Sequence, residues 1–328
     1  TTEFARMHRT DHSMLPPTPA ATIAYKSPNA CNICHKDKDA AWADTQVRKW
    51  RKRDYQAPIL YRASLMDAAR KHDWSRLPEM LTYVTSKDRD EVFATSLIRL
   101  VPASSDPRIV PMLLTAIKDP SPLVRSAAAV ALEAVHTREA VNALVAATRD
   151  PSRLVRVRAA ASLAPYKDLP LPDADKKAVD AANKEYLASL MSRPDQWESH
   201  YNLGNYYLES GDLSRAIASY ETALQREPRA VLAMTNEGMA YARMGNNQKA
   251  GEAFQKALGL SPDNATVLFN MGLLKAEEND LKAAEANLRA AFKADPQMAK
   301  AAYNLSVLLA KDNLDEAVDF STKAARLR

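Results

Sequence analysis

The stretch GNYYLESGDLSRAIASYETALQREP, residues 204–228, decides the fold, because its pattern returns at a fixed spacing of 34 residues. Seven of its positions recur together in the next unit, as Gly238, Tyr241, Gly245, Ala250, Phe254, Ala257 and Pro262. A third copy keeps Gly272, Ala284, Ala291 and Pro296, and a fourth keeps Leu305, Ala317 and Ala324 after a one-residue deletion. Small residues let paired helices cross closely, and the proline ends each unit. The stretch therefore predicts a series of stacked helix pairs.

This combination of positions resembles the tetratricopeptide repeat, with about four copies over residues 195–328. The resemblance implies a superhelical array with a concave surface that can bind a protein. Asparagine recurs at one repeat position in all four copies, as Asn202, Asn236, Asn270 and Asn304. Asparagines in that place either clamp a peptide carboxylate or support the array itself.

A second kind of repeat precedes the first, over residues 73–166. The segment Asp119 to Leu132 recurs as Asp150 to Leu163, 31 residues later, and a weaker copy lies around residues 88–101. Each of the two strong copies has an Asp-Pro before an alanine-rich apolar run, which predicts a capped helix start with a proline in the first turn. The pattern resembles HEAT repeats. Residues 167–194 are expected to form a linker and a bridging helix.

The most chemically suggestive segment lies near the amino-terminal end, in residues 1–72. Cys31-Asn-Ile-Cys34-His35 contains both cysteines of the chain. Two cysteines three positions apart lie about one helical turn from each other, so both can bond one porphyrin, and the adjacent histidine can bind its iron. We predict a c-type haem held by Cys31 and Cys34, with His35 as the proximal axial ligand.

The segment before this motif contains His8 and His12 and leads into a proline-rich stretch that is expected to be extended. Either histidine is a candidate for the second axial ligand of the haem iron. The run Thr10-Asp-His-Ser13, the run from Ser27 to Lys38 and the following Trp42 together resemble multihaem c-type cytochromes that carry tetratricopeptide repeats. The resemblance implies a bis-histidine haem with His12 as the distal ligand and His8 as the alternative.

This chain resembles the carboxy-terminal portion of those cytochromes. Members of that family have several C-x-x-C-H motifs upstream, whereas only one occurs in this chain. We therefore expect one haem c here, with further haems in a segment before Thr1 or in a partner. The fold class expected is all-α: a short haem-binding segment followed by an α-solenoid of HEAT-like and then tetratricopeptide repeats.

The net charge of +5 is concentrated around the motif. Up to Arg62 there are eleven lysines and arginines against six acidic residues, while the remaining 34 basic and 34 acidic residues cancel. This excess favours an acidic redox partner or neutralised haem propionates, although it is equally typical of a solvated basic face. Nucleic-acid binding is not expected, because the basic cluster belongs to no known reading motif. No apolar run is long enough for a transmembrane helix.

We expect an extracytoplasmic electron-transfer cytochrome whose repeats contact a redox partner, a neighbouring cytochrome or a second copy of the chain. Covalent haem attachment takes place outside the cytoplasm, which favours a periplasmic or extracellular location in a bacterium. One alternative is a haem enzyme or ligand-binding subunit with an open sixth iron site. Another is a non-redox interaction scaffold in which the cysteines form a disulfide or half a metal site.

Overall fold

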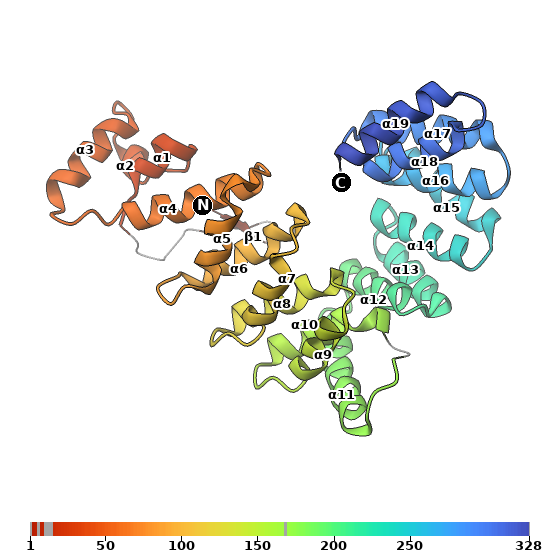
Figure 1. The fold of residues 1–328 in the computed structure, drawn as a ribbon, viewed down its shortest axis with the longest axis horizontal. Coiled ribbons are helices and arrows are strands. Elements are labelled where there is room, and N and C mark those ends of the chain that lie inside the picture. The colour runs from red at the N-terminus through yellow and green to blue at the C-terminus, as the bar shows by residue number, and fades with distance from the viewer. Residues whose placement is uncertain (1, 5–6, 10–15, 167–168, 328) are drawn as a thin grey trace. The chain divides into compact units, whose positions relative to one another are not determined.

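The computed structural model describes residues 2–4, 7–9, 16–166 and 169–327. Apart from two three-residue strands, β1 (Thr2–Phe4) and β2 (Met7–Arg9), the regular structure in these ranges is helical. The strands pair antiparallel, with Glu3 opposite His8. The expected all-helical repeat architecture is confirmed, and Figure 1 shows the successive helices. None of the described helices is both long and apolar enough to cross a membrane.

The chain divides into two compact units, residues 1–143 and 144–328. The first unit contains α1 (Pro19–Tyr25), α2 (Cys31–Cys34), α3 (Ala40–Trp50), α4 (Ala57–Arg70), α5 (Leu77–Thr85), α6 (Glu91–Leu100), α7 (Ile109–Ala116) and α8 (Pro122–Ala131). Helix α9 (Arg138–Ala147) contains the boundary. Short 3-10 turns occupy Trp74–Arg76, Val101–Ser104, Leu132–Ala134 and Ala164–Tyr166.

The second unit contains the 34-residue repeats. Its helices are α10 (Arg153–Ser162), α11 (Asp173–Leu190), α12 (Trp197–Glu209), α13 (Leu213–Arg226), α14 (Val231–Arg243), α15 (Asn247–Leu260), α16 (Ala265–Glu277), α17 (Leu281–Ala294), α18 (Ala299–Leu309) and α19 (Leu314–Arg326). Helices α12 to α19 form four successive pairs, as the sequence predicts.

Glycine allows the two helices of a repeat to approach each other closely. A Cβ atom at Gly204 would lie 2.5 Å from the ring of Tyr220, and a Cβ atom at Gly238 would lie equally close to Phe254. Tyr220 and Phe254 are almost fully buried and belong to one continuous hydrophobic core. The glycine and aromatic positions of the sequence pattern therefore meet across the first two helix pairs.

The amino-terminal segment differs from the expectation of an extended chain. Prolines at positions 16, 17, 19 and 28 predicted coil throughout residues 1–30, but α1 begins at Pro19. Proline is tolerated there because the first residue of a helix has no intrahelical acceptor for its amide. The alanine-rich residues that follow then continue the helix.

Candidate functional site

The cysteine motif lies on α2, a helix of one turn that two asparagines hold in place. Asn29 is buried, and its Oδ1 accepts a hydrogen bond from the backbone N–H of Cys31 at 3.0 Å. The Nδ2 of Asn29 donates to Oδ1 of Asn32 at 2.6 Å. The Nδ2 of Asn32 donates in turn to the carbonyl oxygen of Lys38 at 2.7 Å. These polar contacts fix the loop on both sides of α2.

The side chains at the carboxy-terminal end of α2 are exposed. Cys34 and His35 are solvent-exposed, Cys31 is half-buried, and Ile33 is 69% exposed. Both cysteines are free thiols in this structure. The structure therefore places two thiols about one turn apart beside an accessible imidazole.

His35 contacts the first turn of α3. Its ring centroid lies 4.9 Å from that of Trp42, with 52° between the ring planes. Asp39 caps α3 by accepting a hydrogen bond from the backbone N–H of Trp42 at 2.7 Å. The cap thereby sets the position of the half-buried indole against the imidazole. The contact with His35 places Trp42 next to the candidate iron ligand.

Gln56, directly before α4, joins that helix to α1 and α3. It is only 1% exposed, and its Oε1 accepts a hydrogen bond from the backbone N–H of Ala20 in α1 at 3.1 Å. Its Nε2 donates to Oδ1 of Asp44 in α3 at 2.7 Å. Partial burial acts to raise the pKa of Asp44, but hydrogen bonds from Arg48 and Gln56 outweigh it and leave that pKa below its usual value. Sequence reasoning missed Gln56, because its partners are distant in the chain.

These residues fit a covalently attached haem. The donor set of two thiols and one imidazole within five residues is the one that c-type attachment needs. Within the described ranges, there is no group of three or more histidine, cysteine and acidic side chains that could hold a metal ion by themselves.

The two candidates for the distal iron ligand are His12 and His8. His12 lies outside the described residues. His8 belongs to β2, of which the structure describes the backbone pairing with β1. The assignment of either histidine as an axial ligand therefore stays a prediction.

The repeated asparagines make contacts inside the array. The Nδ2 of Asn236 donates to Oδ1 of Asn205 at 2.8 Å, which also accepts from the hydroxyl of Tyr220 at 2.8 Å. Asn270 and Asn304 donate to the backbone carbonyls four residues earlier in their own helices. Three copies of this position therefore have partners within the protein.

Two arginines occupy equivalent positions in the two strong HEAT-like copies, Arg125 and Arg156. Arg125 and Arg156 each donate to carbonyl oxygens of their own preceding loop, at residues 119–120 and 150–151. Arg156 also binds both carboxylate oxygens of Glu185 in α11, at 3.0 and 2.9 Å. Hydrogen bonds from both arginines close the turn before their helix. The contact of Arg156 with Glu185 also attaches α11, which is the expected bridging helix.

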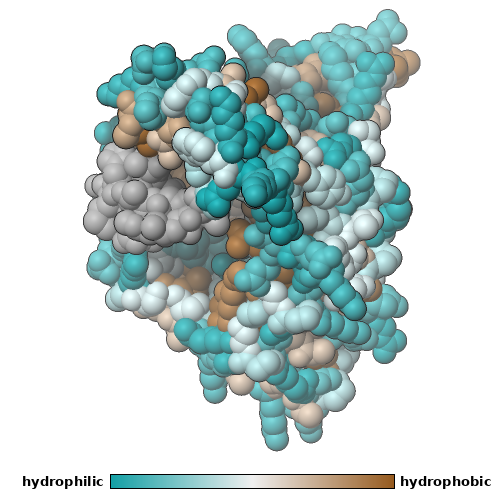
Figure 2. Space-filling model, turned by 90° about the vertical axis from the view of Figure 1, so that its left-hand side faces the viewer, coloured by the Kyte–Doolittle hydropathy of each residue, from teal (hydrophilic) through white to brown (hydrophobic). Residues whose placement is uncertain are grey.

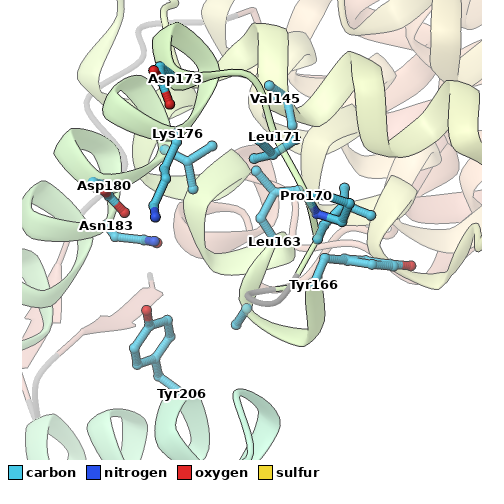
Figure 3. A pocket seen from close by; sticks show the side chains of 13 residues that line it. Val145, Leu163, Tyr166, Pro170, Leu171, Asp173, Lys176, Asp180, Asn183 and Tyr206 are labelled. Carbon is cyan, nitrogen blue, oxygen red and sulfur yellow. The ribbon is translucent and has the colours of Figure 1, made fainter.

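A cavity of about 460 Å³ lies in the second unit beside α11. Figure 3 shows Asp173, Lys176, Asp180 and Asn183 of α11 along one side, Tyr206 of α12 below them, and aliphatic side chains opposite. Burial raises the pKa of Tyr206, so its hydroxyl stays protonated at neutral pH. The cavity therefore combines a polar and an apolar wall.

Comparisons with known proteins agree with the two repeat types. The tetratricopeptide repeat family matches residues 177–224, 201–265 and 269–327. The HEAT repeat family matches residues 78–164. No curated protein matches the chain. The described chain is thus a helical-repeat scaffold of a class that mediates contacts between proteins.

Similar solved structures are tetratricopeptide-repeat proteins. A crystal structure of MamA is 21% identical, covers 48% of this chain and 96% of its own, and has a TM-score of 0.40. A thermophilic repeat protein of Thermus thermophilus is 24% identical, covers 45% and 82%, and has a TM-score of 0.41. YrrB, described as having an unusual peptide-binding site, is 21% identical, covers 57% and 93%, and has a TM-score of 0.36.

Proposed function

We propose that this chain is an extracytoplasmic c-type cytochrome that transfers electrons and uses its helical repeats to contact partner proteins. The observation that carries the proposal is the pair of free thiols on α2 with the exposed His35 directly after them. This arrangement supports haem attachment, because all three groups are within reach of one porphyrin at the surface.

Cys31 and Cys34 would hold the porphyrin by thioether bonds, and His35 would bind the iron on the proximal side. When bound, the haem supplies one-electron iron redox chemistry. The Asn29–Asn32 hydrogen bonds keep the three groups in register, and Trp42 limits rotation of the His35 ring. His12, or alternatively His8, would be the distal ligand.

Electron transfer is favoured over catalysis at the iron. Two imidazole ligands would occupy both axial positions and leave none for a substrate. Two described histidines outside the motif have contacts to neighbouring protein groups. His72 stacks on Trp74, and His200 is buried with its Nε2 2.9 Å from the carbonyl oxygen of Pro194. These contacts are structural in character.

The proposed location follows from the chemistry of attachment. Haem is joined to C-x-x-C-H motifs outside the cytoplasm, so the chain would work in the periplasm or at the cell surface of a bacterium. Its partners would be a redox protein or a neighbouring cytochrome that contacts the repeats.

Haem staining of the denatured protein tests the proposal. The chain is exported in a bacterial host that attaches haem, and thioether-bound haem stays with the polypeptide in a denaturing gel. We expect a stained band for the wild type and none for Cys31→Ala/Cys34→Ala. The double variant should keep its helical circular dichroism, which separates loss of attachment from loss of folding. An unstained wild-type band would refute the proposal and favour the scaffold alternative.

The absorption spectrum separates electron transfer from the open-site alternative. A reduced haem with two histidine ligands should not change its spectrum when carbon monoxide is added. His35→Ala should create a haem that binds carbon monoxide, and His12→Ala should do the same if His12 is the distal ligand. A wild-type haem that binds carbon monoxide readily would favour the enzyme or ligand-binding alternative.

A further inference from the structure

The most unusual exposed surface of the first unit is the turn Lys49-Trp-Arg-Lys-Arg53, here called the basic turn. Helix α3 ends at Trp50, and Arg51 continues in an extended conformation. All five side chains are exposed. Figure 2 looks onto the side on which α3 lies in Figure 1, and most of that face is hydrophilic.

Trp50 differs from the other three tryptophans. Trp42, Trp74 and Trp197 are half-buried, and each contacts another aromatic ring. Trp50 is 69% exposed and has no ring contact in the described part of the chain. An indole has a large apolar area, so its exposure indicates that a binding partner covers Trp50.

The cations near Trp50 differ in whether they have an acidic partner. Arg48 pairs with Asp44 at 2.7 Å and with Asp54 at 3.4 Å. Within the described residues, Lys49, Lys52 and Arg53 have no ion pair. The turn therefore has an uncompensated positive charge beside an exposed indole.

A shallow cavity of about 220 Å³ lies at the same place. Its lining includes four basic side chains, the carboxylate of Asp54 and the ring of Tyr55; the basic ones are Arg48, Arg51, Lys52 and Arg53. The guanidinium of Arg51 lies 5.8 Å from the centre of the Tyr55 ring. Arg48 already pairs with Asp44 and Asp54, whereas Lys52 and Arg53 have no ion pair among the described residues. Their donors suit a phosphate group, which carries several acceptor oxygens.

We propose that the basic turn docks the protein on an anionic phospholipid surface. The lysines and arginines would contact headgroup phosphates, and Trp50 would enter the interface, where tryptophan is enriched. Lys49, Lys52 and Arg53, without ion pairs in the described ranges and beside an exposed indole, combine the two features that favour an anionic lipid interface. A lipid headgroup layer also adapts its shape to a projecting turn. The inference does not depend on haem attachment.

Sedimentation of the chain (residues 1–328) with vesicles tests this inference. We expect binding to phosphatidylcholine vesicles that contain phosphatidylglycerol, weak binding to pure phosphatidylcholine, and a decrease with added salt. Lys49→Gln/Lys52→Gln/Arg53→Gln should weaken binding about 100-fold, since each cation near an anionic surface contributes about fivefold. Trp50→Ala should weaken binding without changing the charge.

A matched control removes three other exposed lysines, in Lys282→Gln/Lys293→Gln/Lys311→Gln, and should retain binding. Circular dichroism checks that all variants fold. Inorganic phosphate at constant ionic strength separates the lipid surface from a free phosphate site, because docking predicts that it does not release the protein. Three outcomes would each overturn the proposal. Phosphate could release the protein, the control variant could lose as much vesicle binding as the triple variant, or the wild type could fail to bind anionic vesicles. The last outcome would instead favour an acidic protein partner.

Discussion

At the scale of single residues, the contact between Gly204 and the Tyr220 ring makes a prediction with an internal control. A Cβ atom at Gly204 would lie 2.5 Å from a ring carbon of Tyr220, which is fully buried. Gly204→Ala should therefore lower the free energy of unfolding by about 1–3 kcal/mol, the usual effect of overpacking. Gly259 lies in α15 with nothing near its would-be Cβ, so Gly259→Ala should raise that free energy by up to about 1 kcal/mol. Urea denaturation measures both, and equal effects would contradict the packing argument.

Glu237 of α14 gives a pH-dependent prediction. Burial and the nearby Glu221 raise its pKa above the ordinary value of 4.5. The folded state therefore binds a proton more tightly than the unfolded state, and this group opposes folding increasingly as the pH rises above that value. The melting temperature of Glu237→Gln should exceed that of the wild type at pH 7, and the difference should disappear near pH 4. Glu277→Gln, an exposed control in α16, should show no such trend. A pH-independent difference for Glu237→Gln would argue against the assignment.

The chemistry of the motif can be read from residue types, whereas its surroundings cannot. Cys31, Cys34 and His35 are adjacent in the chain, so their grouping is local and was predictable. Gln56 is 36 residues from Ala20, and the hydrogen bond between them exists only after folding. The same limit applies to Asn236, whose partner Asn205 comes from the preceding repeat.

At the scale of elements, the start of α6 depends on one side chain with two tasks. Oδ1 of Asp90 accepts hydrogen bonds from the backbone N–H groups of Val92 and Phe93, and Oδ2 pairs with Arg62 at 3.0 Å. Asp280 performs only the first kind of task, for Ala283 in α17. Asp280→Ala should lower the free energy of unfolding by about 1 kcal/mol.

Asp90→Ala should lower the free energy of unfolding by more than Asp280→Ala does, because Arg62 also loses its partner carboxylate. Asp90→Asn keeps an oxygen for the cap and should have a smaller effect than Asp90→Ala. Guanidinium denaturation of Asp280→Ala, Asp90→Ala and Asp90→Asn gives the order of their losses in free energy of unfolding. A smaller loss for Asp90→Ala than for Asp280→Ala would show that the ion pair contributes nothing.

Local patterns predicted most elements but not α1. The repeat helices contain small residues, capping residues and prolines in phase, so local preference and packing agree. In α1 the prolines indicated coil, while tertiary contacts favour a helix. The hydroxyl of Tyr55 donates to the carbonyl oxygen of Pro17, and Gln56 accepts from Ala20. Both partners lie beyond the reach of a local pattern.

At the scale of the molecule, the repeats predict how a local defect spreads. In an array, each repeat is stabilised mainly by its neighbours. Phe254 is 1% exposed and lies in the core that links α13 to α16. Phe254→Ala should lower the stability of the second unit by about 3–5 kcal/mol. Hydrogen exchange should show the largest loss of protection in α14, α15 and α16, with a smaller loss in α10 and α11 of the same unit. Leu232→Ala, which truncates an exposed side chain of α14, should leave the exchange pattern unchanged. An equal loss of protection in all helices of the unit would mean that it unfolds as one cooperative block, and nearest-neighbour coupling would then be wrong.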